Sequence, residues 1–172
     1  PLLSNTGINC WGKNNYGQLG DNTITDRPTP VAVLIFSPEI NVDGNNVNII
    51  NGDTTPAVTD NTDFGIVQIS SPVNKTFRIT NDGALLTLTL PITLSGTECS
   101  KFVDTTPPAS TVAPSGGITT FTITYTPTVA TTDTCTVSIA NDDSDENPYT
   151  FAISGIGSSL CSTQGQIPVA QC

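Results

Sequence analysis

A chain of 172 residues carries 15 acidic and five basic side chains and no histidine, which gives a formal net charge of −10 at pH 7. This charge repels phosphate backbones and anionic lipid surfaces, so we expect neither a nucleic acid nor a membrane surface as a partner. The sequence has no run of about 18 apolar residues, so we expect no membrane span.

Thr, Val, Ile, Asn, Gly and Pro are abundant and helix formers are scarce, which is typical of an all-β protein with many turns. The length suits one domain with arms. We predict an N-terminal arm over residues 1–37, a sandwich over 38–157 and a tail over 158–172. Pro38 marks the first boundary because proline breaks strand pairing. The chain starts at Pro1 with no basic-apolar leader, so we expect a processed protein or a piece of a longer product.

In chain order, the first distinctive segment is CWGKNNYGQLGDNTITDRPTP at residues 10–30, whose glycines suit tight turns between short strands. The segment resembles one repeat of a propeller of the regulator-of-chromosome-condensation type, in which Trp11 would be a core residue. A single propeller repeat cannot bury its own core. The resemblance therefore implies that the segment belongs to a propeller completed elsewhere, or that it packs on another surface.

A strongly apolar run follows this segment. Leaving the run exposed would create an aggregation hazard, and burying it gains several kcal/mol at roughly 25 cal/mol per Å². An open sandwich edge accepts an added strand through main-chain hydrogen bonds. We therefore predict that the arm does not fold as an independent domain. It should join a sandwich edge of the same or the next subunit through Val31, Val33, Leu34, Ile35 and Phe36.

Residues 38–157 contain short stretches in which apolar and polar side chains alternate, the pattern of half-buried strands. Turn residues such as Asn81-Asp82-Gly83 and Ser115-Gly116-Gly117 separate these stretches. The pattern predicts an antiparallel two-sheet β-sandwich without long helices. Its predicted core consists of Phe77, Ile79, Leu86, Leu88, Phe121, Ile123, Val137, Ile139, Phe151 and Ile153.

Four segments follow one another in order within the same zone: PEINVDGNNVNIINGDTTPAVTDNTDFGIVQI, TFRITNDG, TTFTITYTP and VSIANDDSDENPYTFAISGIG. Over residues 38–157 they resemble the choice-of-anchor D repeat, an Ig-like relative of the ASPM/SPD-2/hydin domains. The resemblance implies an Ig-like sandwich, tandem arrays and large secreted or surface-anchored bacterial proteins, and it implies no catalytic activity. Cys99 and Cys135 are not part of that pattern.

None of the five cysteines sits in a C-x-x-C pair, and the chain lacks histidine, so disulfides in an oxidising compartment are favoured over a zinc site. We predict that Cys99 pairs with Cys135, since each is expected at the start of an apolar strand segment. Cys161 with Cys172 would close a small loop in the tail. Because the count is odd, Cys10 is the expected odd partner. The cysteines and the acidic, Thr-rich composition together predict an extracellular or cell-surface location.

The acidic run between the last two predicted strands is a weak candidate for a calcium site. Carboxylates are calcium ligands, but their spacing here lacks the regular pattern of an EF-hand loop. We interpret the run as a solvated hairpin turn ended by Pro148 and predict no metal. The residues concerned are Asp142, Asp143, Asp145 and Glu146. We interpret a second group, Asp53, Asp60 and Asp63, as part of a long polar loop.

Without histidine, neither a Ser-His-Asp nor a Cys-His nucleophile can be built. Nothing places two carboxylates on facing walls of a cleft, as a glycoside hydrolase would require. We therefore predict no enzyme and no cofactor. The favoured function is an extracellular structural protein, a subunit of a bacterial surface filament or array in which copies of the chain join by strand addition. The alternative is an adhesive or ligand-binding Ig-like module of a large cell-surface protein.

Overall fold

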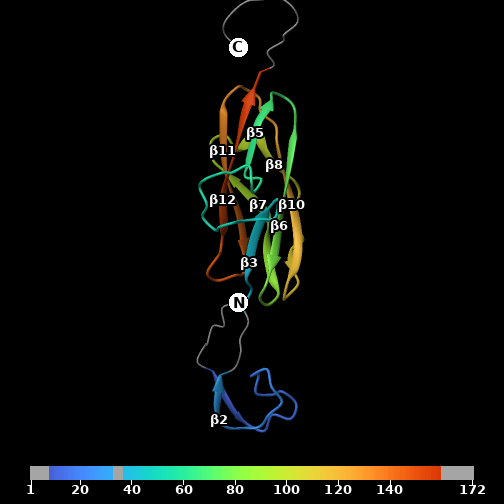
Figure 1. Cartoon of the computed structure of the whole chain (residues 1–172), viewed down its shortest axis with the longest axis vertical. Helices are drawn as coiled ribbons and strands as arrows, with labels where there is room; N and C mark the ends of the chain where they lie inside the picture. Colours follow the sequence, from blue (N-terminus) through green and yellow to red (C-terminus); the bar gives the residue numbers. More distant parts are fainter. Residues whose placement is uncertain (1–7, 33–36, 160–172) are drawn as a thin grey trace, which may run out of the picture.

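The computed structural model describes residues 8–32 and 37–159, and strands dominate both parts (Figure 1). Residues 8–32 contain an antiparallel hairpin of β1 (Asn9–Gly12) and β2 (Arg27–Ala32). The second part forms two five-stranded sheets and one short 3-10 helix, η1 (Cys99–Lys101). In these described ranges, no helix has the length and apolar character needed to cross a bilayer.

The first sheet has the strand order β4-β3-β6-β10-β8, and all its pairings are antiparallel. Its strands are β3 (Ile40–Gly44), β4 (Val47–Ile49), β6 (Val73–Asn81), β8 (Phe102–Thr106) and β10 (Gly117–Tyr125). Non-consecutive strands lie side by side in this order, so the chain crosses between the sheets several times.

The second sheet has the order β5-β12-β11-β7-β9 and is antiparallel except for the parallel pair of β12 and β5. Its strands are β5 (Asp63–Gln68), β7 (Leu86–Ser95), β9 (Thr111–Val112), β11 (Thr132–Asn141) and β12 (Tyr149–Ser158). The prediction of an all-β, two-sheet sandwich is therefore confirmed.

Strand alternation places one set of side chains between the two sheets. All ten residues predicted for the core are buried. Phe77 of β6 stacks on Phe121 of β10, with ring centroids 5.2 Å apart, and lies 5.5 Å from the ring of Phe151 in β12. The Phe77 ring thus connects the two sheets, and burial of a side chain of this size contributes about 1.5–3 kcal/mol.

Two details of the predicted strands are wrong. Cys99 does not begin a strand, because the chain leaves β7 at Ser95 and passes through Gly96 with φ of 138°, a conformation that favours glycine. Cys99 instead begins η1. Cys135 lies inside β11, which starts at Thr132.

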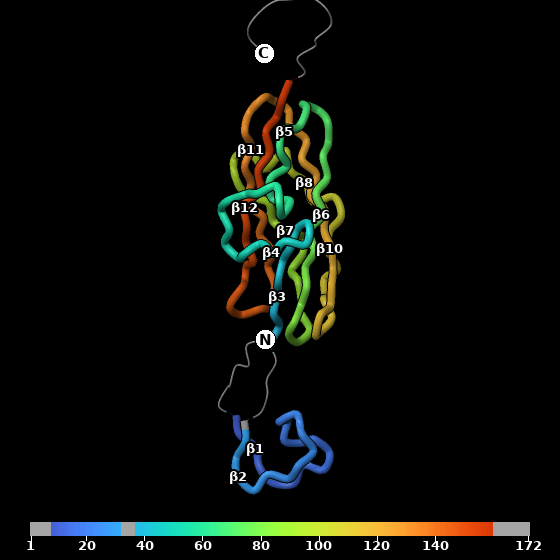
Figure 2. Tube along the Cα trace, viewed as in Figure 1, coloured from blue at the N-terminus to red at the C-terminus, as the bar shows by residue number. Residues whose placement is uncertain are grey.

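The loop between β4 and β5 lies along the side of the sandwich, against β12 (Figure 2). The amide of Gly52 donates to the carbonyl of Thr150, and the amide of Ala152 donates to the carbonyl of Asp53. Figure 1 also shows that β3 starts at one end of the sandwich and β12 finishes at the opposite end. The chain therefore enters and leaves the sandwich at opposite ends.

The hairpin of the arm pairs Cys10 in β1 with Val31 in β2. Val31, predicted to join a sandwich edge, is therefore part of the arm's own two-stranded sheet. The other four residues of that predicted joining segment, from Val33 to Phe36, lie outside the described residues. All hydrogen bonds described for residues 8–32 connect groups within the arm.

Candidate functional site

The predicted disulfide between Cys99 and Cys135 is confirmed. The two Cα atoms lie 5.0 Å apart, and the bridge links residues separated by 36 positions in the sequence. It ties η1, in the connection between β7 and β8, to the middle of β11. Cys10 is a free thiol in the described part of the chain, and the predicted pair Cys161–Cys172 lies outside that part.

Lys101 and Asp133, each two positions from a half-cystine, form the centre of a polar cluster. Lys101 Nζ donates to Asp133 Oδ1 at 2.5 Å and to Glu98 Oε2 at 2.8 Å. The Tyr125 hydroxyl donates to the other oxygen of Asp133 at 2.6 Å. The Asp133 side chain is fully buried and that of Lys101 is 10% exposed, so water has little access to this ion pair.

Burial alone would raise the pKa of the Asp133 carboxyl, but hydrogen bonds from Lys101, Tyr125 and Thr131 outweigh it and hold that pKa below its usual range. The pKa of Lys101 is raised, mainly by its hydrogen bond to Asp133 and to a smaller extent by its hydrogen bond to Glu98. Burial, together with the bond to Asp133, raises the pKa of the Tyr125 hydroxyl. The lysine is therefore held as a cation and the tyrosine as a neutral donor, which favours a stabilising role over proton transfer.

The acidic run forms the β11–β12 hairpin turn, as predicted, but the turn is not solvated throughout, because Asp143 is buried. Asp142 accepts from the amide of Thr87 at 2.7 Å, while the buried Asp143 accepts from the amides of Ile40 at 3.0 Å and Asp145 at 3.5 Å. Burial raises the pKa of the Asp143 carboxyl. These two carboxylates satisfy backbone donors, and the described residues contain no group of three or more acidic or cysteine side chains that could hold a metal ion.

Of the three acids that we interpreted as part of a long polar loop, Asp53 and Asp60 lie between β4 and β5, whereas Asp63 is the first residue of β5. Each accepts hydrogen bonds from a residue two positions further along. Asp53 accepts from Thr55, and Asp60 accepts from Thr62, in each case from the amide and the hydroxyl of the threonine. Asp63 accepts from the amide of Gly65 at 2.8 Å. Such local bonds fix the course of the loop.

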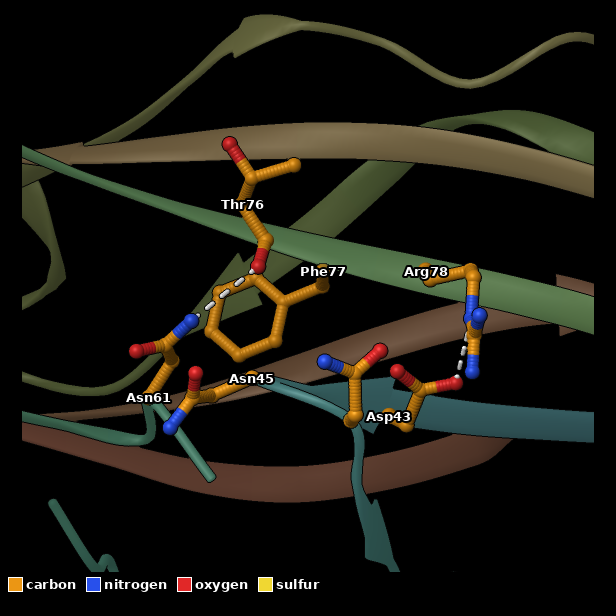
Figure 3. A pocket seen from close by; sticks show the side chains of 7 residues that line it. Asp43, Asn45, Asn61, Thr76, Phe77 and Arg78 are labelled. Atoms are coloured by element: carbon orange, nitrogen blue, oxygen red, sulfur yellow. Dashed lines mark hydrogen bonds and ion pairs between the residues drawn. The ribbon is translucent and has the colours of Figure 1, made fainter. Parts of the chain in front are cut away.

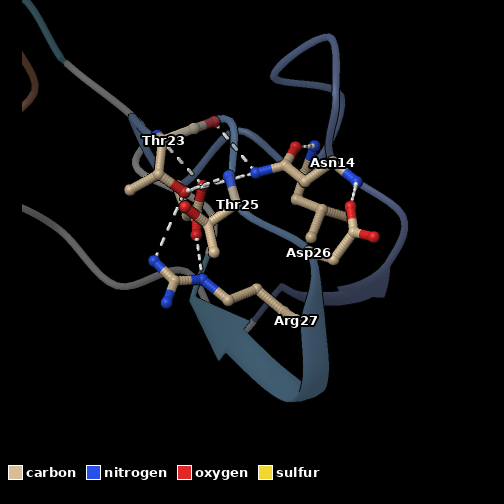
Figure 4. A network of polar contacts seen from close by, with 7 residues as sticks. Asn14, Thr23, Thr25, Asp26 and Arg27 are labelled. Atoms are coloured by element: carbon tan, nitrogen blue, oxygen red, sulfur yellow. Dashed lines mark hydrogen bonds and ion pairs between the residues drawn. The ribbon is translucent and has the colours of Figure 1, made fainter.

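A polar network shapes the arm (Figure 4). The buried Asn14 side chain accepts from the amide of Leu19 at 2.9 Å and donates to Asp21 at 3.0 Å and to the Thr23 carbonyl at 2.9 Å. Arg27 Nε donates to Asp21 at 2.7 Å, and this bond is the main reason that the pKa of Asp21 falls to about 2. The network holds the loop between β1 and β2 in one conformation.

The apolar side chains of the arm are largely uncovered. Among the side chains described in residues 8–31, Leu19 is the only buried apolar one. Trp11, expected in the core of such a repeat, is 63% exposed, and Tyr16 is 91% exposed. The expectation that Trp11 is a core residue is therefore wrong within the part of the chain that the structure describes, where the indole ring is largely exposed.

A depression of about 220 Å³ opens on the outer face of the first sheet (Figure 3). Asp43 of β3 and Arg78 of β6 form an ion pair at 2.8 Å on one side of it. The amide side chains of Asn45, Asn46 and Asn61 come from two turns, one after β3 and one before β5.

Sequence reasoning missed this depression, for which the only signal was the turn Asp43-Gly44-Asn45-Asn46. It also missed the Lys101–Asp133–Tyr125 cluster.

These features define a disulfide-linked, all-β sandwich with an Ig-like, two-sheet architecture and a small attached hairpin. A family model described as the regulator of chromosome condensation (RCC1) repeat matches residues 9–42. This match covers the arm and continues into β3 of the sandwich. A search of curated proteins gave no match to the chain.

Several solved structures share part of the architecture at low identity. A protein of unknown function from Porphyromonas gingivalis W83 is 15% identical with a TM-score of 0.49, and the alignment covers 77% of this chain and 59% of that one. The ASH/PapD-like domain 7 of human CEP192 is 15% identical with a TM-score of 0.42, covering 67% of this chain and 96% of that domain. The secreted serine protease VesC from Vibrio cholerae is 15% identical with a TM-score of 0.44, covering 55% and 21%. Because these similarities are low, the function has to be inferred from the chain's own residues.

Proposed function

We propose that this chain is an extracellular, non-catalytic structural module that forms a filament or array by joining copies of itself through the N-terminal arm. The observation that carries the proposal is the uncovered apolar surface of the arm. Ile8, Trp11, Tyr16 and Ile24 are 52%, 63%, 91% and 73% exposed. A repeat with so little core of its own needs a neighbour that covers these side chains.

The sandwich suits a module that connects neighbours. The chain enters at one end and leaves at the other, so successive units would lie end to end (Figure 1). The Cys99–Cys135 bridge supports an oxidising, extracellular setting, because disulfides persist there and are rare in the cytosol. The resemblance to choice-of-anchor D repeats, which occur in tandem in secreted proteins, agrees with this arrangement.

The sandwich edges differ in how well they would accept an added strand. In the edge strand β8, Asp104 lies on the side that faces the other sheet. Its Oδ1 is buried and has no hydrogen-bond partner among the described residues. Inward-pointing charges of this kind discourage edge pairing. Strand β7 is an open edge only beyond its short pairing with β9. There it contains Pro91, which has no amide hydrogen to donate to an added strand. The edge strand β4 has only three residues. We therefore assign the accepting edge to β5, which has six residues and whose Ile66 is 76% exposed.

The test is a comparison of assembly with and without the arm. Deletion of residues 1–36 should leave a folded but monomeric sandwich, measured by circular dichroism and by light scattering after gel filtration. The intact chain should form larger species that electron microscopy resolves as filaments or arrays. Continued assembly of the deleted protein would contradict the proposal, as would an intact monomer whose arm folds against its own sandwich.

A double substitution tests the exposed side chains of the arm without deleting the arm. Trp11→Ser with Tyr16→Ser removes two exposed rings and should reduce assembly without changing the melting of the sandwich. The matched control is Ile118→Ser, which removes a 59% exposed side chain from the sandwich instead. Equal effects of the arm and control variants would indicate nonspecific hydrophobic association.

A ligand-binding module is the second candidate. One observation favours it, namely the depression on the outer face of the first sheet.

A further inference from the structure

We propose that the outer face of the first sheet binds a neutral oligosaccharide, with the depression between β3, β6 and the turn before β5 as the main subsite. This binding does not depend on the proposed assembly through the arm. The subsite residues are Asp43, Asn45, Asn46, Asn61, Thr76 and Arg78.

The depression offers both hydrogen-bond donors and hydrogen-bond acceptors. Arg78 uses Nε for the bond to Asp43 Oδ2, and its two terminal nitrogens have no partner among the described residues. Asn45 donates to the Thr59 carbonyl at 3.1 Å, and Asn61 donates to the Thr76 carbonyl at 3.3 Å. These bonds use the amide nitrogens and orient the side chains, while the Asn45 carbonyl oxygen stays available. A sugar hydroxyl both donates and accepts, so it matches such a mixed set.

The backbone holds three of the amides in place. Asn45, Asn46 and Asn61 have φ of 52°, 60° and 68°, the left-handed region that asparagine tolerates better than most residues. Asn46 forms no hydrogen bond through its side chain with any described residue. The side-chain amide of Asn46 is therefore free to bind a ligand, while the backbone of the turn determines where this residue lies.

A row of hydroxyl groups extends from the depression across the sheet. Thr76 lies 3.0 Å from the hydroxyl of Thr122 in β10. Thr124 donates to Asn74 at 2.8 Å and lies 3.0 Å from the hydroxyl of Thr105 in β8. The hydroxyls are ordered by contact with one another, and they continue the polar surface over three strands. A chain of sugars would therefore meet more of this face than a single sugar would.

The charge of this face favours a neutral ligand. The protein has a net charge of −10. The charged groups at the depression are Asp43 and Arg78, which pair with each other, and Lys75, whose Nζ donates to Asn61 Oδ1 at 3.4 Å. The acidic molecule as a whole repels polyanions. The outer positions of these four strands hold no exposed aromatic ring, so hydrogen bonds rather than stacking must supply the affinity.

The test is a titration followed by NMR with cellohexaose, laminarihexaose and maltohexaose as neutral probes and a hexauronate as the anionic probe. At least one neutral probe should shift the side-chain amide signals of Asn45, Asn46 and Asn61, more strongly than its monosaccharide does. The binding should change little with added salt, because a neutral probe carries no charge to be screened. The hexauronate should bind more weakly than the neutral probes. Absence of shifts with all three neutral probes would overturn the proposal.

Glycine variants test the subsite without straining the turns. Asn46→Gly and Asn61→Gly keep a backbone that accepts positive φ and remove one amide each, so each should weaken binding about tenfold, the equivalent of one or two hydrogen bonds. The control Asn22→Gly, at φ of 56° in the arm, should bind as the parent does. Thr122→Val should weaken hexasaccharide binding, whereas Thr134→Val on the other sheet should not. Unchanged binding in all the subsite variants would place any binding elsewhere and refute the assignment.

Discussion

Asp133 shows how a single carboxylate can be tolerated inside a sandwich. Its two oxygens receive hydrogen bonds from Lys101 and Tyr125, and the Tyr125 ring is itself packed against the backbone of β12. A Cβ atom at Gly155 would lie 2.4 Å from Cε1 of that ring, so only glycine allows this approach. Removing either donor would leave a buried negative charge short of a partner, which costs more than the bond itself contributes.

We expect Tyr125→Phe to lower the free energy of unfolding by about 1–3 kcal/mol, because Asp133 Oδ2 loses the hydroxyl and remains buried. Urea denaturation at pH 7 measures the change. The control Tyr16→Phe removes a hydroxyl from a 91% exposed ring and should leave stability unchanged. A Tyr125→Phe protein as stable as the parent would show that water reaches Asp133.

The pH dependence of stability follows from the low pKa of Asp133. Ionised Asp133 contributes stability above the ordinary carboxyl pKa of about 4, and this contribution is lost as the pH falls through the lower folded value. Asp143 and Glu146 have raised pKa values and act in the opposite direction. The stability of the parent minus that of Asp133→Asn should therefore shrink in urea titrations as the pH falls below about 4.

At the scale of elements, two links join the β7–β8 connection to β11. The disulfide starts from Cys99 and the ion pair from Lys101, and they reach Cys135 and Asp133 respectively. The connection has only one helical turn of regular structure, so these links define its position. They also close the side of the sandwich on which β7 and β8 pass between the two sheets.

Replacing both half-cystines, Cys99→Ala with Cys135→Ala, should lower the free energy of unfolding by about 3–4 kcal/mol in the chain-entropy view, for a bridge spanning 36 residues. Replacing both residues avoids leaving one cysteine of the pair as a free thiol. Denaturant unfolding without reductant provides the measurement, and Cys10→Ala is the control. A loss well below 1 kcal/mol would mean that the unfolded chain already holds this loop compact.

At the scale of the whole molecule, the contrast is between a well-packed sandwich and an arm held together by polar bonds. The sandwich core contains stacked and edge-on aromatic rings from both sheets. The arm has an ordered polar loop and one buried leucine. Its stability therefore depends on whatever covers its exposed rings, and the arm should open more readily than the sandwich.

The single tryptophan reports on this difference, because Trp11 lies in the arm and no other residue contributes indole fluorescence. The dilute protein should emit like a water-exposed indole, in keeping with its 63% exposure. Emission should move to shorter wavelength as the concentration rises and the arm becomes covered. The Trp signal should also change at lower urea than the circular dichroism of the sandwich. A concentration-independent, buried-type emission would contradict assembly through the arm.

The sandwich and its core could be predicted from the residue pattern alone, because strand alternation is a local property of the backbone. Side chains such as Phe121 and Ile153 must face inward once their polar neighbours face water. Contacts between distant groups could not be predicted, because they depend on how the strands are arranged in space. Lys101 and Asp133, or Asn45 and Asn61, come together only through the stacking and register of strands far apart in the chain. The exposure of Trp11 could not be predicted either, since burial in a repeat depends on a neighbour rather than on the repeat's own residues.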